Sequence, residues 1–528
     1  MTKKKGIFFL VDSLRYDVIN DLEKFKNCLP NLYKIYKKSV LHHCVANSRS
    51  TQFVLPSLFT LSYPLDYGGY DTGIRHRPIS FVELLKSKNF ETYMVSNSNQ
   101  IGVTNGYHRG FNKIKTTVDF KTLLEHRIGR TIKPRIKKSN DIKFAIKELE
   151  IFFDELIYGI ENYDKELWTK KLLNSNLELA KNFKKEKKLL TISPEIVIKK
   201  IMLISQGNYY KFLGEEKINY FKYYLDKLFS GISWRTRRFI NMMPNLFPFT
   251  WYGHISVRFN RFNKLFASII EKLNSENNSF FIYFHLMDLH DNRDITDIMF
   301  FLKKFRFLPR LILAKLKGLT NRSLNYDLSL MYIDFLLEPL IQLIENKKLD
   351  DVVILFTADH GSSIAHAPKR QKRDSERFLE MYREDLEVPV LVFNGKNDTN
   401  VKQFIDSMDT TAIFLSELGI DDLPIYFKGE SKKTKDYIIS EHAGRGSSDM
   451  LLNDLYFTIT KRDEKLFVIL KKDYLIPTAY FNLISDKNET KNLINDFNCQ
   501  NKINELLEFL IKERKEVLEK RSYKIKKI

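Results

Sequence analysis

The sequence predicts an α/β protein with a large mixed, mostly parallel sheet flanked by helices, a helical insertion and a small C-terminal α+β subdomain with an antiparallel sheet. Three observations predict this fold class. Short apolar runs alternate with segments whose apolar residues recur at helical spacing. The alternation stops at a lysine-rich stretch over 113–250, and short strand-like runs replace it from 431 onward. A chain of 528 residues has room for about three such units.

On both sides of the lysine-rich stretch, the chain up to residue 430 contains apolar runs short enough to be buried strands. They are Gly6–Val11, Val40–Ala46, Thr92–Ser96, Phe280–Leu286, Val352–Thr357 and Val388–Phe393. Segments with helical spacing separate them, at Ser80–Ser87, Asn263–Asn274, Tyr326–Asn346 and Val401–Leu418. We therefore expect residues 1–112 and 251–430 to form one α/β domain.

The other two predicted units differ in pattern. Residues 113–250 contain few Gly and Pro residues and have the character of long helices, which predicts a basic helical insertion between two strands of the main sheet. Residues 431–528 predict the C-terminal subdomain. Its expected strands and closing helix are Tyr437–Ser440, Tyr456–Thr460, Leu466–Leu470, Ala479–Leu483 and Lys502–Arg521.

Charge and cysteine content limit the partners and the compartment. Lys and Arg number 86 against 65 Asp and Glu, a formal net charge of +21. This excess suits an anionic partner, although base-biased coding explains a Lys-rich chain equally well. The three cysteines, Cys28, Cys44 and Cys499, are too few and too far apart for a disulfide scaffold. With no signal peptide or membrane span in the sequence, we expect a cytoplasmic protein.

Two basic, aromatic segments have two interpretations. Tyr220–Phe247 and Met299–Lys317 both combine large apolar residues with Lys and Arg. They suit peripheral contact with an anionic membrane surface. They equally suit a helical lid whose apolar face covers the main domain and whose lysines face water. The sequence leaves both interpretations open.

Polar residues that can bind metal follow two of the predicted strands. Asp12 comes directly after the run Phe8–Val11, and Asp359-His360-Gly361 comes after Val352–Thr357. In a parallel sheet the carboxyl ends of strands are where sites form. A carboxylate and an imidazole there suit a divalent ion such as Zn or Mn. The alternatives are a helix cap at Asp12 and a structural Asp–His pair.

A third segment places hydroxyl groups before a helix start. Ser50 and Thr51 precede Pro56-Ser57, where free backbone N–H groups favour an anionic oxygen. A neutral hydroxyl is a poor nucleophile, but a bound cation stabilises its alkoxide. An ordinary helix cap is the competing interpretation.

Taken together, these three segments resemble the sulfatase branch of the alkaline phosphatase superfamily. That family shares a strand-end Asp near the N-terminus, a nucleophile before a Pro-Ser helix start, and a later T-A-D-H-G. Five further segments follow family motifs in the same order: Phe280–Asp291, Tyr326–Asp334, Val388–Val392, Asp409–Gly419 and Ala479–Leu493. The first resembles the segment that ends M-D-P-H, with Leu289 in place of Pro.

The resemblance implies roles for individual residues. It implies that Asp12, Thr51, Asp359 and His360 surround one divalent cation, either Ca, Mg, Mn or Zn. His290 matches the family histidine that contacts the ester anion or protonates the leaving group. The weaker candidates for the anion pocket are Arg49, His366 and His442.

The chain departs from the family at the nucleophile. Family sulfatases carry C-x-P-S-R, whose Cys is oxidised to formylglycine, but Val54 occupies the position two before Pro56 and Cys44 lies too far upstream. Thr51, five residues before Pro56, instead resembles the Thr-x-x-x-x-Pro spacing of phosphoethanolamine transferases. We therefore expect Thr51 to be the nucleophile, with Ser50 in reserve.

The expected function is a metal-dependent, sulfatase-like hydrolase that cleaves a sulfate or phosphate ester of a carbohydrate or lipid. The first alternative is a phosphoethanolamine or glycerol-phosphate type transferase that acts on a surface glycan or lipid. The second is a non-catalytic binding protein on the same fold. A nucleic-acid partner is not expected, because the sequence has no zinc-finger or RNA-recognition motif.

Overall fold

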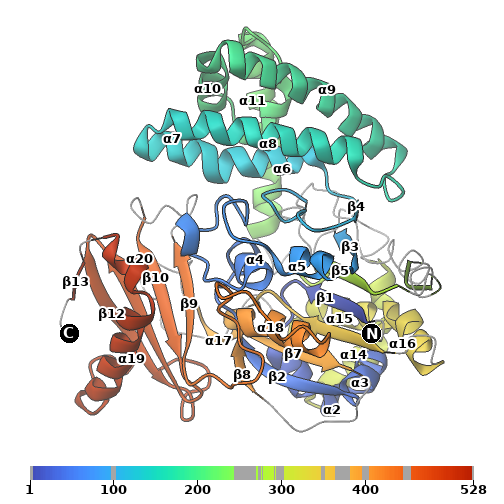
Figure 1. The fold of residues 1–528 in the computed structure, drawn as a ribbon, viewed down its shortest axis with the longest axis vertical. Helices are drawn as coiled ribbons and strands as arrows, with labels where there is room; N and C mark the ends of the chain where they lie inside the picture. The colour runs from blue at the N-terminus through green and yellow to red at the C-terminus, as the bar shows by residue number, and fades with distance from the viewer. Residues whose placement is uncertain are drawn as a thin grey trace.

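The computed structural model describes most of the chain. The described residues are 4–96, 103–242, 269–271, 275, 278–290, 292, 302–346, 351–362, 381–394, 403–443, 453–521 and 523–525. Within them lie two sheets and a group of long helices (Figure 1).

The large sheet has eight strands in the order β4-β3-β5-β1-β6-β7-β2-β8. Their bounds are β1 Lys5–Val11, β2 Ser39–Val45, β3 Glu91–Ser96, β4 Lys113–Thr116, β5 Phe280–Leu286, β6 Val352–Thr357, β7 Glu387–Phe393 and β8 Phe404–Asp406. The predicted fold class is confirmed, and every predicted strand of this part is present to within one residue at each end. The pattern did not predict β4 and β8, which have only four and three residues.

Most neighbouring strands of this sheet are parallel. The exception is β7, which runs antiparallel to both β6 and β2. The central strand β1 pairs with β5 on one side and β6 on the other, and Leu10 lies opposite both His285 and Thr357. Because β1 is covered on both faces, its residues Ile7–Val11 are fully buried.

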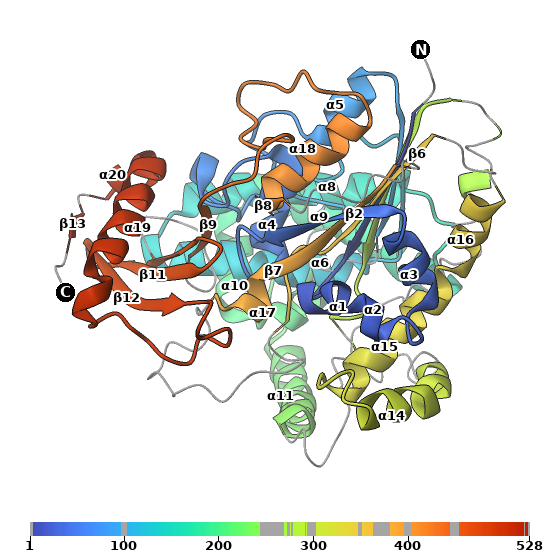
Figure 2. The same cartoon turned by 90° about the horizontal axis from the view of Figure 1, so that it is seen from below.

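Helices cover both faces of the large sheet (Figure 2). One face carries α4 Thr51–Thr60, α5 Phe81–Ser87 and α18 Ser407–Glu417. The other carries α1 Tyr16–Asn20, α2 Leu22–Phe25, α3 Pro30–Tyr36, α14 Leu308–Leu316, α15 Leu324–Leu336 and α16 Glu338–Glu345. Between β6 and β7 lies the short α17, Arg383–Leu386.

Two of the four helices predicted with the main sheet differ from the structure, and a third lies mostly outside the described residues. The segment Tyr326–Asn346 forms two helices, because Pro339 in the first turn of α16 cannot continue α15. The segment Val401–Leu418 contains the strand β8 before α18 begins at Ser407, so its first part is not helical. Most of Asn263–Asn274 lies outside the described residues.

The long helices follow β4 and lie at one end of the molecule (Figure 1). They are α6 Phe120–Arg127, the π-helix η2 Ile128–Ile132, α7 Lys133–Ser139, α8 Ile142–Asn162, α9 Lys170–Ile192, α10 Pro194–Leu203 and α11 Tyr220–Met242, with the 3-10 turn η3 at Gln206–Phe212. Further 3-10 turns are η1 Asp66–Gly68, η5 Phe305–Phe307 and η7 Phe497–Cys499. The division of the chain into domains stays a prediction.

The second sheet is formed by the C-terminal part. Its order is β13-β12-β11-β10-β9, and the pairs from β9 to β12 are antiparallel. The strands are β9 Ile438–Ala443, β10 Leu455–Thr460, β11 Glu464–Lys471, β12 Tyr474–Asn482 and β13 Lys524–Ile525, with helices α19 Gln500–Glu513 and α20 Lys515–Glu519 against them. Among the described helices, none combines the length and hydrophobicity needed to cross a bilayer.

Candidate active site

Three adjacent strands deliver the candidate site residues to the same edge of the large sheet. Asp12 follows β1, Asp359 and His360 follow β6, and His285 lies near the end of β5. Because β5, β1 and β6 are parallel and in register, these side chains meet although their positions span almost 350 residues of sequence. Carboxyl ends of parallel strands are where α/β proteins place their ligands.

Asp12 lies at the centre of this group. Its carboxylate accepts hydrogen bonds from the Ser13 hydroxyl at 2.8 Å and from Thr51 Oγ1 at 3.0 Å. Burial alone would raise the pKa of Asp12, but the nearby histidines His290, His285 and His360 lower it well below its usual range. The side chain is therefore a buried carboxylate anion.

Asp359 and His360 occupy the turn after β6. Gly361 is required there, because a Cβ atom at that position would overlap the carbonyl oxygen of Glu384. The Nδ1–H of His360 donates to the Gly361 carbonyl at 2.6 Å. Its other ring nitrogen, Nε2, lies 3.5 Å from Asp359 Oδ2 and 3.7 Å from Asp12 Oδ1.

Thr51 is the first residue of α4 and is buried beside these groups. Besides its hydrogen bond to Asp12, its Oγ1 lies 3.4 Å from His360 Nε2. The residue before it, Ser50, has extended backbone angles and is the N-cap, so Thr51 is the first helical residue and not an ordinary helix cap. The helix thus points the Thr51 hydroxyl into the group, with the positive end of the helix behind it.

His285 is a member of the group that sequence reasoning missed. Its Nε2 lies 3.9 Å from Asp12 Oδ2, and its Nδ1 is 3.3 Å from the Tyr283 hydroxyl. The only signal in the sequence is a histidine within the apolar run Phe280–Leu286, where a polar side chain needs a reason to be buried.

The ligand atoms of Asp12, His285 and Asp359 all lie within 4.8 Å of one another. Both carboxylate oxygens of Asp359 and Nε2 of His285 are buried, and no described residue hydrogen-bonds them. Burial and the neighbouring Asp12 carboxylate raise the pKa of Asp359. An unsatisfied carboxylate that is crowded by a second carboxylate and lies next to an imidazole fits a divalent cation, which would compensate the charge and the missing hydrogen bonds.

The predicted anion-pocket residues Arg49 and His442 lie close to each other, on the loop before α4 and on β9. The positive charge of Arg49 and, above all, burial lower the pKa of His442 to about 3, so its ring is neutral at pH 7. Arg49 also lies 3.8 Å from the Asp385 carboxylate. The ring of His442 packs edge-on against Phe53 of α4, 4.2 Å between ring centroids.

The remaining two predicted residues are His290 and His366. His290 follows β5 in an exposed position and acts on the pKa of Asp12, which places it at the open side of the group. His366 lies outside the described residues.

A comparison with family models matches part of the chain. Residues 206–420, which include His285, His290, Asp359 and His360, match the Sulfatase family model. The resemblance to sulfatases is confirmed. No curated protein matches the sequence of this sulfatase-like chain.

Solved structures agree on the fold. The phosphonate monoester hydrolase of Agrobacterium radiobacter superposes with a TM-score of 0.51 at 13% identity, covering 98% of this chain and 96% of that one. A 2-O GAG sulfatase superposes with a TM-score of 0.50 at 11% identity, covering 100% of this chain and 95% of that one. Ps i-CgsB, solved with k-i-k-neocarrahexaose, superposes with a TM-score of 0.52 at 12% identity, covering 97% of this chain and 92% of that one. At these identities, the likeness shows that the chain has the sulfatase fold.

Proposed function

We propose that this sulfatase-like protein is a metal-dependent hydrolase that cleaves a sulfate or phosphate ester with Thr51 as the nucleophile. The observation that carries the proposal is the position of the Thr51 hydroxyl. It begins a helix, donates to the Asp12 carboxylate at 3.0 Å, and lies 3.4 Å from Nε2 of His360. No formylglycine precursor is present at this point of the chain.

The chain's own residues account for most of the proposed chemistry. Asp12 orients the Thr51 hydroxyl, and His360 Nε2 accepts its proton as Oγ1 attacks. Oγ1 then forms a bond to the sulfur or phosphorus atom as the ester oxygen leaves. His290, at the open side, supplies a proton to that leaving alcohol. Water subsequently releases the sulfate or phosphate from Thr51.

A divalent cation held by Asp12, His285 and Asp359 would lower the free energy needed to form the Thr51 alkoxide. It would also offset the charge of the ester oxygens. Ca, Mg, Mn and Zn all remain candidates, because oxygen and imidazole ligands suit each of them to some degree. Arg49 and the neutral His442 would contact the remaining ester oxygens from the side of β9.

The experiment is parallel turnover of an aryl sulfate, a phosphate monoester, a phosphodiester and a phosphonate ester with each of the four ions. We expect turnover of at least one probe, and we expect Thr51→Ala to reduce kcat by about 10³-fold or more, because it removes the attacking atom. Ser50→Ala is the matched control and should keep most of the activity. Unchanged turnover in Thr51→Ala would overturn the proposal, and turnover of no probe would favour the non-catalytic binding protein.

A transferase acting at a membrane is the second candidate, and helix α11 favours it. The polar side of α11 faces the protein: Lys222 pairs with Glu215 at 2.7 Å, Asp226 with Lys211 at 2.9 Å, and Asn208 donates to Ser230 at 3.1 Å. The apolar side faces outward with Phe221, Tyr224, Leu225, Leu228, Phe229 and Ile232 exposed. Their spacing of three and four residues makes one continuous stripe.

Because its apolar side faces outward, helix α11 suits contact with the surface of an acidic bilayer. Apolar side chains would enter the boundary between headgroups and acyl chains, and the net charge of +21 would attract anionic lipid. Helix α14 also exposes Ile312, Leu313 and Leu316, and it projects on the same side as α11 in Figure 2. We propose a cytoplasmic protein with peripheral membrane contact, whose ester is carried by a carbohydrate or a lipid.

A further inference from the structure

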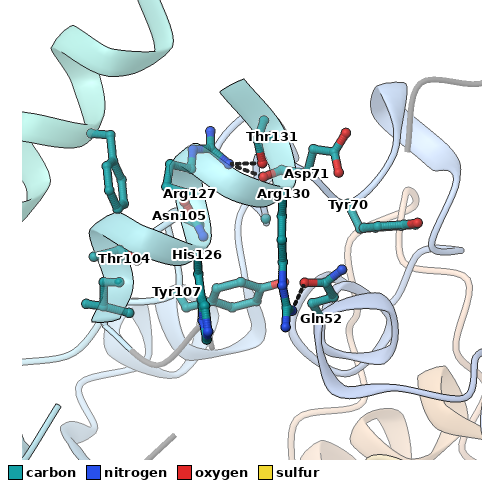
Figure 3. Close-up of a pocket in the computed structure, with 13 residues that line it drawn as sticks. Gln52, Tyr70, Asp71, Thr104, Asn105, Tyr107, His126, Arg127, Arg130 and Thr131 are labelled. Atoms are coloured by element: carbon teal, nitrogen blue, oxygen red, sulfur yellow. Dashed lines mark hydrogen bonds between the residues drawn. The ribbon is translucent and has the colours of Figure 1, made fainter. Parts of the chain in front are cut away.

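Only a small cavity separates helix α4, which carries Thr51, from the long helices (Figure 3). Its volume is about 40 Å³, which leaves room for a few water molecules. From the helical side, Arg130 donates to Gln52, the residue after Thr51, at 2.8 Å, as a dashed line shows in Figure 3. This contact helps to fix the start of α4, whereas Asp12, which accepts the hydrogen bond of Thr51, is fixed in a different way.

The turn after β1, which begins at Asp12, has a strained backbone. Ser13 has a φ angle of +67°, in the left-handed region that residues other than glycine rarely adopt. Its hydroxyl donates to the Asp12 carboxylate at 2.8 Å, so the backbone angle at Ser13 decides where one hydrogen-bond donor to this carboxylate lies. Such a conformation persists only where the surrounding structure holds it.

The hydroxyl of Tyr326, on helix α15, holds this turn. It donates to the Ser13 carbonyl at 2.9 Å and accepts from the Arg15 backbone N–H at 3.1 Å. One hydroxyl thereby connects two backbone groups of the turn. Because Tyr326 is fully buried, removal of its hydroxyl would take this partner from both groups in a place that water does not reach.

The start of helix α15 is itself held in place on both sides of Tyr326. Ser323 is the N-cap, and its hydroxyl accepts from the Tyr326 N–H at 3.3 Å. The residue after Tyr326, Asp327, is fully buried and accepts from Nε of Arg322 and from Oγ1 of Thr320, each at 2.8 Å. Tyr326 therefore reaches the turn after β1 from a fixed position.

Arg15 links this turn to the second segment that carries candidate metal ligands. Its guanidinium donates to the carbonyl of Ser362, in the segment after β6, at 3.2 Å, and pairs with Asp17 at 2.9 Å. The side chain thus connects the turn that begins at Asp12 with the segment that contains Asp359. A residue that fixes the backbone of Arg15 acts on both.

We propose that Tyr326 is a positioning residue for the candidate active site. It holds the turn after β1 in the conformation in which Asp12 binds the divalent cation and accepts the hydrogen bond of Thr51. The inference rests on the proposed function, which gives Asp12 these two tasks. Tyr326 acts through the backbone of Ser13 and Arg15 and takes no part in the bonds that form and break, so its first effect is on metal affinity.

A competition titration of Mn²⁺ against a chelating dye, on the metal-free full-length protein, tests this without turnover. Tyr326→Phe keeps the ring and its packing and removes only the hydroxyl. We expect this variant to bind Mn²⁺ about 10–100-fold more weakly, the loss that is typical when a residue that orients a metal ligand is removed.

Tyr209→Phe is the matched control. The Tyr209 hydroxyl is also fully buried, and it donates to Glu186 at 2.6 Å within the long helices. Urea unfolding should show a comparable loss of stability in the two variants, because each loses the hydrogen bonds of one buried hydroxyl. Tyr209→Phe should nevertheless bind Mn²⁺ as wild type does.

Unchanged Mn²⁺ affinity in Tyr326→Phe would overturn the positioning role. An equal loss of affinity in Tyr209→Phe would also overturn it, because the loss would then follow stability alone. Asp359→Ala separates this failure from a failure of the proposed function. If Asp359→Ala loses Mn²⁺ while Tyr326→Phe keeps it, the metal site stands and the positioning role is wrong. If Asp359→Ala binds Mn²⁺ as wild type does, the metal site is wrong, and the positioning role falls with it.

Discussion

His285 shows what a single residue adds to the proposed site. Its Nε2 is buried 3.9 Å from the Asp12 carboxylate, and none of the residues that the structure describes hydrogen-bonds it. Its other ring nitrogen is positioned by the Tyr283 hydroxyl at 3.3 Å. A metal-binding histidine needs this arrangement, with one nitrogen free for the ion and the other fixed by a partner.

We predict that His285→Ala lowers the affinity for Mn²⁺ or Zn²⁺ by about 100-fold or more. Loss of a residue that only hydrogen-bonds a metal ligand already lowers metal affinity by about 10–100-fold. The measurement is metal content per chain by elemental analysis, together with a competition titration. His42→Ala is the control, because His42 is also buried in a strand of the same sheet and should leave metal content unchanged. Full metal content in His285→Ala would contradict the ligand role.

The sequence was informative where one short segment carries the chemistry. Asp12, Asp359 and His360 each follow an apolar run directly, so their place at the carboxyl end of a strand could be predicted without knowing the pairing. His285 could not be found in that way. Its role depends on β5 lying next to β1, and a register that places His285 opposite Leu10 is not written in either segment alone.

At the scale of elements, the first residue of β7 ties this antiparallel strand to its neighbours. Glu387 pairs with Arg383 of α17 at 3.0 Å and lies 3.4 Å from His43 of β2. Burial raises the pKa of Glu387, but the charges and hydrogen bonds of His43 and Arg383 outweigh it and lower the pKa to about 2. The charged carboxylate therefore stabilises the junction of β7, β2 and α17.

This gives a prediction with a definite sign. The pKa of Glu387 is lower in the folded than in the unfolded chain, so its contribution is present above about pH 4.5 and is lost as pH falls toward 2. The contribution is at most about 3.4 kcal/mol, because the pKa falls from 4.5 to about 2 and each pKa unit corresponds to about 1.36 kcal/mol. We expect Glu387→Gln to lower the free energy of unfolding at pH 6 and to narrow its gap to wild type by pH 3.

Urea unfolding at several pH values measures this gap. Glu345→Gln removes a carboxylate that is half exposed and paired with Lys34 at 3.0 Å, and an exposed pair contributes only about 0–1 kcal/mol. The free energy of unfolding of Glu345→Gln should therefore stay close to that of wild type at every pH. A gap between wild type and Glu387→Gln that stays constant from pH 6 to pH 3 would show that the carboxylate charge is not the cause.

Elements were predictable when their own pattern was strong. The six apolar strands could be predicted, because a continuous apolar run of that length seldom forms anything other than a buried strand in an α/β chain. The short β4 and β8 were not, since their pairing with β3 and β2, and not their composition, makes them strands. Helix α11 illustrates the same limit: its amphipathic period was readable, but not which side faces the protein.

For the molecule as a whole, the outward apolar stripe of α11 predicts association with acidic membranes. We expect the protein to sediment with vesicles that contain phosphatidylserine and to be released by high salt, because screening weakens the attraction of basic residues to the lipid. Vesicles of phosphatidylcholine alone should bind it more weakly. The double variant Phe221→Ser, Phe229→Ser should reduce vesicle binding at least about tenfold, since each phenylalanine gains about 1.5–3 kcal/mol when fully buried.

A matched variant decides whether the loss of vesicle binding is specific to α11. Phe497 is even more exposed than Phe221, at 88% against 76%, but lies in the C-terminal part, so Phe497→Ser removes a comparable apolar surface elsewhere. Its vesicle binding should equal that of wild type. If wild type ignores acidic vesicles, or if Phe497→Ser and the α11 variant lose binding alike, the stripe does not contact a membrane. The transferase candidate would then lose the observation that favours it, while the hydrolase proposed from Thr51 would be unaffected, because no membrane enters its chemistry.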